Sequence, residues 1–272
     1  MPGPLAAPEP AATTTPGPPH PGTALVTGAS AGIGAEFARQ LAARGHNLVL
    51  VARDAERLEE AAVRLRAAYA VRVDVLPADL GDADQLRRVE DRLAEADRPV
   101  QLLVNNAGFA VKGGFLAHTA DQEQAMLDVM VVAVLRLTHA ALGPMTERGS
   151  GGVINVSSVA AYLPRGTYSA TKAWVNSFSI WAAQEYRERG VTVLAVCPGF
   201  VRTEFHQRMG VSQGAAPGFF WLRPERVVRE ALRDFDRGRV VSIPTRRYRL
   251  VTATARLVPA GMLRTYRRLS PR

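Results

Sequence analysis

From residue 23 onward, short apolar runs alternate with longer segments whose apolar residues recur every three or four positions. Short continuous apolar runs are typical of strands buried on both faces, and the longer period is typical of amphipathic helices. The pattern therefore predicts seven strands separated by helices. We expect strands at 24–27, 47–52, 71–76, 100–105, 153–157, 191–197 and 239–244, and helices at 32–44, 54–69, 82–96, 121–148, 168–189 and 224–238.

This alternation predicts an α/β fold. We expect a Rossmann-type, doubly wound sheet of seven parallel strands with helices on both faces. Open sheets of this kind bind their ligands outside the carboxyl ends of the strands. Functional residues are therefore expected in the segments that directly follow each strand.

The two ends of the chain differ in composition from the segment between them. Residues 1–22 hold eight of the 18 prolines and one charged side chain, Glu9. Such a segment can neither pair its backbone regularly nor bury a core. Residues 245–272 hold eight arginines and no acidic residue. We expect a disordered proline-rich leader over 1–22, one catalytic domain over 23–244, and a basic amphipathic helical tail over 245–272.

The net charge is a property of this tail. Of the 34 basic residues, eight lie in the tail, and the other 26 nearly balance the 25 acidic residues. A basic tail can meet nucleic acid or an anionic membrane, or form a solvated helix face, and we favour the solvated face with no nucleic-acid partner.

A helix over 246–269, bent at Pro259, would separate arginines from an apolar stripe. We expect the domain or a second subunit, rather than a membrane, to cover that stripe, and we expect a homodimer or homotetramer. The arginines are Arg249, Arg256 and Arg267, and the stripe comprises Val251, Val258, Met262 and Leu269.

Composition excludes several classes of protein. Hydrophobic residues make up 47% and charged residues 22%, as in ordinary globular domains. The single cysteine, Cys197, excludes an intrachain disulfide, and His118, His139 and His206 lack metal-ligand spacing. No apolar run approaches the roughly 18 residues that span a membrane, and no secretory signal opens the chain. We therefore expect a soluble cytoplasmic protein without a metal.

The first strand ends in a glycine-rich segment, Thr-Gly-Ala-Ser-Ala-Gly-Ile-Gly, at residues 27–34. Glycines here permit a tight turn and let the next helix N-terminus approach a pyrophosphate closely. The same segment matches the G-x-S-x-G nucleophile elbow of hydrolases around Ser30. A hydrolase elbow normally follows several strands, and only one precedes Ser30, so we disfavour that alternative.

The second predicted strand ends at Ala52 and is followed by Arg53, with no acidic residue at the position that would bind a ribose 2′-hydroxyl. Arginine suits a 2′-phosphate through its charge and its planar guanidinium. We therefore expect NADP(H) rather than NAD(H) as the cofactor. Asp54 is better explained as the N-cap of the next helix.

Tyr168 and Lys172 stand four residues apart at the start of a predicted helix, so they share one face. A nearby ammonium favours the phenolate and brings the pKa of a tyrosine toward the working range. The preceding strand ends in Ser157 and Ser158, and either hydroxyl could bind a carbonyl oxygen at the sheet edge.

These motifs together resemble the short-chain dehydrogenase/reductase family, in particular its bacterial NADP-dependent members. The resemblance covers about 23–203 and extends more loosely to 244. It is carried by the glycine segment at 27–34, Asn-Asn-Ala-Gly at 105–108, Ser158, Tyr-Ser-Ala-Thr-Lys at 168–172, and Cys-Pro-Gly at 197–199.

The resemblance implies a role for each matching position. Tyr168 would be the general acid in carbonyl reduction, Ser158 would orient the substrate oxygen, and Lys172 would bind the nicotinamide ribose and lower the pKa of the tyrosine. The remaining positions would bind the cofactor. Gly28, Ser30, Gly32, Ile33 and Gly34 would hold the pyrophosphate, Arg53 the 2′-phosphate, Asp79 and Leu80 the adenine, Asn105 and Gly108 the cofactor floor, and Pro198, Gly199, Val201 and Thr203 the nicotinamide.

Two positions depart from the family pattern. Met130 stands where the family usually carries an asparagine that holds a water of the proton relay, and the loop from Ser158 to Tyr168 is shorter than usual. An apolar segment at about 200–223, with Phe205, Met209, Phe219, Phe220, Trp221 and Leu222, is predicted to cover the substrate, although these rings could simply pack on the domain or a partner subunit.

The sequence thus predicts an NADPH-dependent oxidoreductase that acts on a hydrophobic ketone or secondary alcohol. Met130 motivates an alternative, in which the chain is a catalytically weak scaffold or sensor that still binds NADP(H). The hydrolase is the third possibility.

Overall fold

The computed structural model describes residues 21–111, 113–163, 166–204 and 217–257. For residues 255–257 it describes the backbone only. The expected leader over 1–20 and the tail beyond residue 257 lie outside the described residues. So do Lys112, His206 and the central part of the segment expected to cover the substrate.

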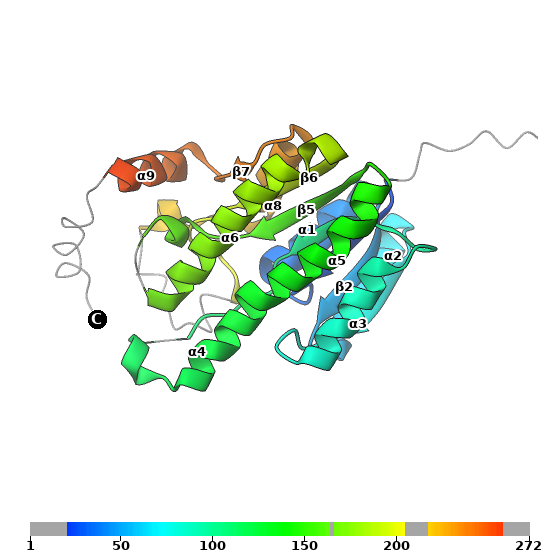
Figure 1. The fold of residues 1–272 in the computed structure, drawn as a ribbon, viewed down its shortest axis with the longest axis horizontal. Helices are drawn as coiled ribbons and strands as arrows, with labels where there is room; N and C mark the ends of the chain where they lie inside the picture. Colours follow the sequence, from blue (N-terminus) through cyan, green and yellow to red (C-terminus); the bar gives the residue numbers. More distant parts are fainter. Residues whose placement is uncertain (1–20, 112, 164–165, 205–216, 258–272) are drawn as a thin grey trace, which may run out of the picture.

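Seven parallel strands form one sheet in the order β3-β2-β1-β4-β5-β6-β7 (Figure 1). This confirms the predicted fold class. The chain order reverses between β1 and β4, so the carboxyl ends of these two strands flank the crevice where such sheets bind ligands. The strands are β1 (Thr23–Thr27), β2 (Asn47–Ala52), β3 (Val73–Pro77), β4 (Val100–Asn105), β5 (Gly151–Val156), β6 (Val191–Val196) and β7 (Val241–Ser242).

Helices cover both faces of the sheet, three on each (Figure 1). One face carries α1 (Gly32–Ala43), α2 (Ala55–Tyr69) and α8 (Pro224–Asp236), and the other carries α3 (Ala83–Ala94), α5 (Ala133–Glu147) and α6 (Gly166–Glu185). Further short helices are α4 (Ala120–Leu127), η1 (Phe115–Ala117), η3 (Val159–Tyr162), η4 (Arg187–Arg189) and η6 (Gly218–Phe220), and α9 (Arg246–Leu257) follows β7.

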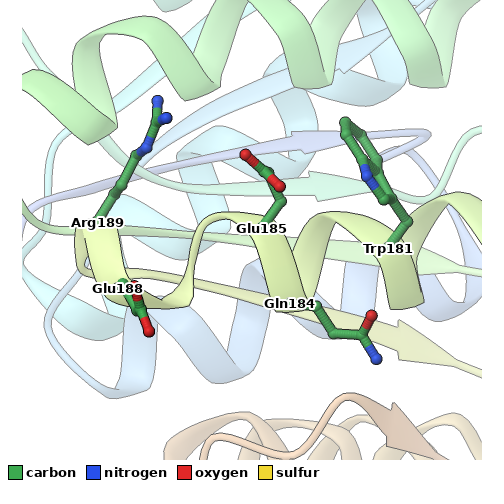
Figure 2. A pocket seen from close by; sticks show the side chains of 5 residues that line it. All are labelled: Trp181, Gln184, Glu185, Glu188 and Arg189. Atoms are coloured by element: carbon green, nitrogen blue, oxygen red, sulfur yellow. The ribbon is translucent and has the colours of Figure 1, made fainter.

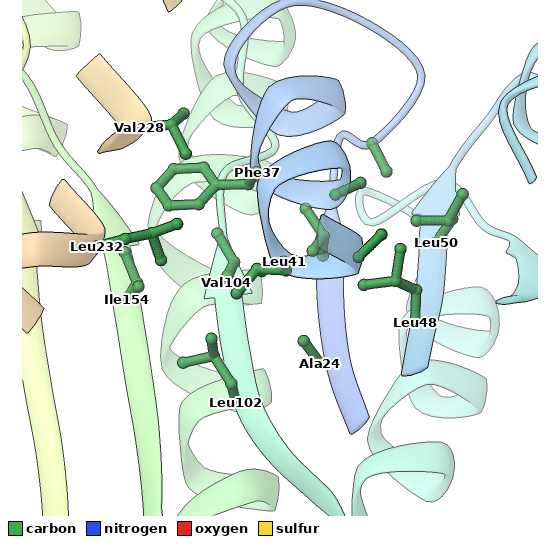
Figure 3. Close-up of a cluster of buried hydrophobic side chains, with 14 of the residues drawn as sticks. Ala24, Phe37, Leu41, Leu48, Leu50, Leu102, Val104, Ile154, Val228 and Leu232 are labelled. Carbon is green, nitrogen blue, oxygen red and sulfur yellow. The ribbon is translucent and has the colours of Figure 1, made fainter. Parts of the chain in front are cut away.

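The two-sided burial explains why the central residues of strands such as β1 and β2 are apolar in unbroken succession. Ala24 and Val26 of β1 belong to the core under α1, whereas Leu25 between them belongs to the core on the other face. Figure 3 shows Phe37 and Leu41 of α1 pointing into the first of these cores, toward the strands. Successive strand residues point to opposite faces, so both must be apolar when both faces are covered.

The long helix predicted over 121–148 is interrupted. The chain runs through α4, a π-helical turn at Asp128–Val132, and then α5. A π turn inserts one extra residue into a helix and is frequent at functional sites. Met130 lies at the centre of this turn. It is 1% exposed, so its side chain lies in the protein interior.

This helical stretch, Ala120–Glu147, is long and apolar enough by length and composition to cross a membrane, contrary to the expectation from the sequence. In the structure α5 packs along the sheet, with Ala133, Leu137 and Ala141 in the core. The core helices of soluble proteins pass the same test, so this stretch is weak support for a membrane span.

The seventh strand is shorter than predicted. It pairs with β6 through Val241 and Ser242 alone. The chain turns away immediately afterwards, since Pro244 has no N–H to donate and Thr245 adopts a left-handed backbone with φ +76°. The Thr245 N–H donates to Glu230 Oε2 over 2.8 Å, which fixes this turn.

The C-terminal helix α9 partly fulfils the expectation for the tail. It buries Tyr248 and Thr252 against the domain, whereas Val251, predicted to belong to the covered stripe, is 39% exposed. The domain of the same chain therefore leaves Val251 largely uncovered, and its cover by a second subunit stays a prediction. Arg256 lies where only the backbone is described, and Val258, Pro259, Met262, Arg267 and Leu269 lie outside the described residues.

Candidate active site

The glycine segment after β1 forms a tight turn tied to the end of β4. Gly28 and Gly32 both have positive φ, +66° and +59°. The Thr27 hydroxyl accepts hydrogen bonds from the N–H groups of Asn106 and Ala107, each over 3.0 Å. In return, Asn106 Nδ2 donates to the carbonyl of Thr27 over 2.9 Å. Two adjacent strand ends are thereby fixed to each other at the edge of the sheet.

The turn leaves a cradle that fits a pyrophosphate. A Cβ atom on Gly34 would lie 2.2 Å from the Gly28 carbonyl oxygen, so only glycine allows α1 to start this close to the turn. The N-cap of α1 is Ala31, which makes no side-chain cap hydrogen bond with the first amides of the helix. Those amides and the helix dipole favour an anion at this end. Ser30 lies in this turn and Ile33 in the first turn of α1, and their contact with a pyrophosphate stays a prediction.

We expect Gly34→Ala to weaken NADPH binding by at least about tenfold, because the added methyl must push backbone atoms apart. Titration of the protein against NADPH, followed by nicotinamide fluorescence, measures this effect. Gly143→Ala is the matched control, since a Cβ at Gly143 in α5 meets nothing within 4 Å. Equal affinities of the two variants would contradict the assignment of the cradle.

Charged groups gather where the adenosine end of a dinucleotide would lie. Arg53 follows β2 and Asp79 follows β3, and Arg53 Nη1 lies 3.9 Å from Asp79 Oδ2. Leu80 is buried, so its contact with an adenine would be made through its backbone. Arg57, in the first turn of α2, places a second guanidinium nearby and forms an ion pair with Glu204 over 3.3 Å. Sequence reasoning missed Arg57; its spacing of four from Arg53, one turn into the next helix, was the available signal.

The structure distinguishes the two serines after β5. Ser157 is 2% exposed, and its hydroxyl donates to the Lys172 carbonyl over 2.8 Å. Ser158 is half-buried, accepts from the Ala160 N–H over 3.1 Å, and forms a side-chain hydrogen bond with Tyr168. Ser158, and not Ser157, is therefore brought to the predicted catalytic tyrosine.

Tyr168 and Lys172 lie one turn apart at the start of α6. Lys172 Nζ lies 5.9 Å from the centroid of the Tyr168 ring and donates to the Val156 carbonyl over 2.8 Å. Burial raises the pKa of Tyr168 to about 12, and its hydrogen bond with Ser158 acts in the opposite direction. Burial lowers the pKa of Lys172 to about 8. Since burial and Ser158 are the causes that act on Tyr168 here, the lowering of its pKa by Lys172 stays a prediction.

Asn105, predicted to line the cofactor floor, uses its side chain inside the sheet. Its side chain is buried and donates to Thr138 Oγ1 over 3.1 Å and to Asn155 Oδ1 over 2.9 Å. It is thus occupied inside the sheet, and its contact with a cofactor would have to come from the backbone. Gly108 lies beside Met130 and Lys172: a Cβ on it would be 3.4 Å from Met130 Cγ and 3.9 Å from Lys172 Nζ.

The segment after β6 closes the site from the other side. The Pro198 carbonyl accepts from the Val159 N–H over 3.0 Å, which joins it to the turn that carries Ser158. Thr203 packs against the glycine turn, since a Cβ on Gly32 would lie 3.1 Å from its methyl group. The predicted nicotinamide and pyrophosphate residues therefore meet at one edge of the sheet.

Cys197 is a buried core residue, as expected. Its thiol donates to Asn176 Oδ1 over 3.1 Å, and burial raises its pKa to about 11. It therefore stays protonated near neutral pH and is a poor nucleophile. Among the described residues, no group of three His, Cys, Asp or Glu side chains could hold a metal ion.

A hollow on the outer surface of the molecule is separate from this centre. It lies at the C-terminal end of α6, whereas Tyr168 and Lys172 lie at its start, and charged groups of both signs line it (Figure 2). The lining residues are Trp181, Gln184, Glu185, Glu188 and Arg189.

Comparisons with known proteins agree with this geometry. The family model described as short chain dehydrogenase matches residues 22–213. The chain is 38% identical to a short-chain dehydrogenase from Sphingobium yanoikuyae solved in complex with NADPH, with a TM-score of 0.80 over 86% of this chain and 93% of that one. It is 35% identical to the bulky-bulky ketone specific alcohol dehydrogenase from Comamonas testosteroni, with a TM-score of 0.76 over 87% of this chain and 92% of that one.

A curated relative is the very-long-chain 3-oxoacyl-CoA reductase-A of Danio rerio, 34% identical over 188 residues. The alignment covers 66% of this chain and 58% of that protein, so the chain spans little more than half of the relative's length.

The chain belongs to the short-chain dehydrogenase family. It is an NAD(P)-dependent oxidoreductase that acts on CH–OH or C=O groups. The hydrolase alternative around Ser30 is thereby overturned, since Ser30 lies in the turn that this family uses for its nicotinamide cofactor.

Proposed function

We propose that the protein is an NADPH-dependent reductase of hydrophobic ketones, and a dehydrogenase of the corresponding secondary alcohols that uses NADP+, with Tyr168 as the general acid and base. The observation that carries the proposal is the convergence of Ser158, Tyr168 and Lys172 at the carboxyl edge of the sheet, beside the glycine cradle.

The residues of this chain have distinct parts in the proposed reaction. The nicotinamide, when bound, supplies the hydride. Ser158 binds the carbonyl oxygen and orients it toward Tyr168, which donates its phenolic proton to that oxygen as negative charge develops. With a pKa of about 12, Tyr168 carries its proton at neutral pH, as reduction requires. Lys172 holds the nicotinamide ribose and replaces the proton of Tyr168.

Apolar side chains support a hydrophobic substrate. Phe219 is 56% exposed and packs in a tilted arrangement against Phe220, with their ring centroids 4.4 Å apart, and the rings of Phe200 and Trp221 lie 5.3 Å apart. Phe205 and Met209 lie outside the described residues. The bulky ketones named for the Comamonas testosteroni enzyme and the long acyl chains named for the Danio rerio relative fit such a wall. Oxidation of NADPH with a panel of apolar ketones and 3-oxoacyl thioesters tests this, and absence of turnover with all of them would contradict it.

The choice of NADP(H) rests on Arg53. It is a cation that directly follows β2, it is largely exposed, and Asp79 Oδ2 lies 3.9 Å from its Nη1. Arg57 adds a second positive charge. The complex of the Sphingobium yanoikuyae enzyme with NADPH supports the same choice.

Arg53→Asp is expected to raise the KM for NADPH by at least about tenfold, because it replaces a charge-assisted contact with repulsion of the phosphate. The KM for NADH, which lacks that phosphate, is expected to change much less. Arg64→Asp, a charge reversal on the exposed face of α2, is the control. Unchanged NADPH kinetics in Arg53→Asp would refute the assignment.

The alternative of a scaffold or sensor rests on Met130, because a thioether cannot replace an amide in a chain of hydrogen-bonded waters. We favour the enzyme, with Met130 filling core space and the proton reaching Tyr168 through Lys172 and solvent. Combined titration with NADPH and an NADPH oxidation assay separates the two, since a scaffold would bind without turnover.

We also propose a homodimer or homotetramer, in the cytoplasm. Outward apolar side chains on α5 and α6 support self-association: Leu135 is 45% exposed and Trp181 is 50% exposed. Light scattering coupled to size-exclusion chromatography measures the assembly, and a monomer at micromolar concentration would contradict it.

A further inference from the structure

The C-terminal helix α9 inserts one tyrosine into the substrate side of the site. Tyr248 is 3% exposed, and its ring lies on the backbone of Gly199. A Cβ on Gly199 would lie 1.9 Å from the ring carbon Cζ, so glycine is required for this contact. Gly199 belongs to the Pro-Gly segment that is predicted to flank the nicotinamide.

The Tyr248 hydroxyl joins two segments far apart in sequence. It accepts a hydrogen bond from the Phe200 N–H over 3.0 Å and donates to the Phe220 carbonyl over 2.9 Å. Both partners are backbone groups, so the hydroxyl fixes the main chain on each side. One buried side chain of α9 thus holds the backbone of Phe200 and that of Phe220 together.

Neighbouring contacts make this junction continuous with the cofactor side. The Leu222 N–H donates to the Phe200 carbonyl over 2.8 Å, and Val201 and Leu222 form a parallel bridge. Tyr248 packs in one apolar cluster with Val201 and Leu222, and this cluster extends to Ile33 in the glycine turn and to Val159 beside Ser158.

The residue before Tyr248 strengthens the same junction. Arg247 Nη1 donates to the Phe219 carbonyl over 2.9 Å, and its guanidinium lies 5.4 Å from the Phe219 ring centroid. Phe219 and Phe220 therefore each bind α9 through their carbonyl groups.

We propose that Tyr248 is a positioning residue for the substrate side of the site. It fixes the backbone of Gly199 and Phe200 beside the nicotinamide, and the backbone of Phe220 among the apolar side chains that would contact the substrate. It thereby determines the KM for bulky ketones. This inference rests on the proposed ketone reductase function. Tyr248 acts through the segments it holds, so its hydroxyl governs substrate fit rather than the proton transfer at Tyr168.

The first test is Tyr248→Phe, which keeps the ring on Gly199 and removes both hydrogen bonds. We expect the KM for benzophenone to rise at least about fivefold, with the KM for acetone, kcat and the Kd for NADPH changed less than about twofold. Tyr69→Phe is the control: its hydroxyl also accepts a hydrogen bond, from Arg39, but on the outer surface. Equal changes for both ketones would show a merely structural role and overturn the proposal.

The second test uses the contact between Gly199 and the ring. Gly199→Ala alone should raise the KM for benzophenone, because its methyl group displaces the Tyr248 ring. In a Tyr248→Ala background, which leaves room for that methyl group, Gly199→Ala should have little further effect. Additive effects of the two substitutions would show that they act independently, against the proposal.

A third measurement needs no turnover. With Trp174 and Trp181 both replaced by Phe, Trp221 is the remaining tryptophan, and its ring contacts Phe200. Tyr248→Phe should then shift the Trp221 emission, while Tyr69→Phe should not. Absence of ketone reduction by the wild-type protein would refute the proposed function, whereas an unshifted Trp221 emission would refute the role of Tyr248.

Discussion

Tyr168→Phe is expected to lower kcat for ketone reduction by at least about a hundredfold, the range lost when a positioned general acid is removed. The substitution keeps the aromatic ring, and with it the packing beside Lys172, but removes the hydroxyl that bonds to Ser158. The Kd for NADPH should stay within about twofold, because the lost proton acts only as charge develops on the substrate oxygen. Steady-state kinetics and a fluorescence titration measure the two quantities separately.

The control for this experiment is Tyr186→Phe. Tyr186 follows the C-terminal end of the same helix, packs edge-on against Trp181 at 6.0 Å, and is remote from Ser158 along α6. It should retain the activity of the wild-type protein. Near-normal turnover of Tyr168→Phe would show that the catalytic acid lies elsewhere and would remove the basis of the proposed mechanism.

The strands were predictable because both faces of the sheet are covered. Continuous apolar runs such as that of β2, alternating with helical patterns, are typical of a parallel sheet, and the predicted bounds of β2 and β4 agree with the structure. The N-cap of α2 was also predicted correctly: the Asp54 carboxylate accepts from the Arg57 N–H over 3.1 Å.

Other features depend on contacts that no local pattern contains. The sequence pattern predicts one continuous helix over 121–148, whereas the structure has a π turn within it. This turn places Met130 against Gly108, which follows a different element of the chain. Asn105 and Asn106 are adjacent and chemically identical, yet one bonds inside the sheet and the other holds the glycine turn. Strand geometry sends successive side chains to opposite sides, but which neighbour each one meets is decided by the assembled sheet.

Tyr248 is the clearest case of a site residue that the sequence hides. The predicted tail helix was analysed for the separation of arginines from apolar residues, and Tyr248 belonged to neither set. Its importance comes from Gly199 and Phe200 on one side and Phe220 on the other, which only the tertiary structure brings together. Gly199 was visible in the Cys-Pro-Gly motif, but the Tyr248 ring for which it leaves space was not.

Lys172 is expected to determine how the reductase activity depends on pH. Its pKa is lowered to about 8 by burial, so the ammonium is present below that pH and is lost as the pH rises through it. Tyr168, with a pKa of about 12, stays protonated over the same interval and cannot cause a change there. Because reduction needs the Lys172 ammonium, kcat/KM for NADPH, which reports groups of the free enzyme, should be level below pH 8 and fall about tenfold per unit above it.

Lys172→Met removes the charge but keeps an apolar chain of similar length in the buried site. We expect it to lower kcat/KM for NADPH by at least about a hundredfold at pH 7 and to abolish the fall above pH 8.

Met130→Asn is the matched variant, because Met130 lies beside the same glycine as Lys172 Nζ, and the new amide could hold a water near that ammonium. It should retain the fall above pH 8, with activity similar to or higher than that of the wild type. A fall that persists in Lys172→Met would assign the titration to another group. A wild-type protein that turns over no ketone, together with a Met130→Asn variant that gains turnover, would establish the scaffold alternative in place of the enzyme.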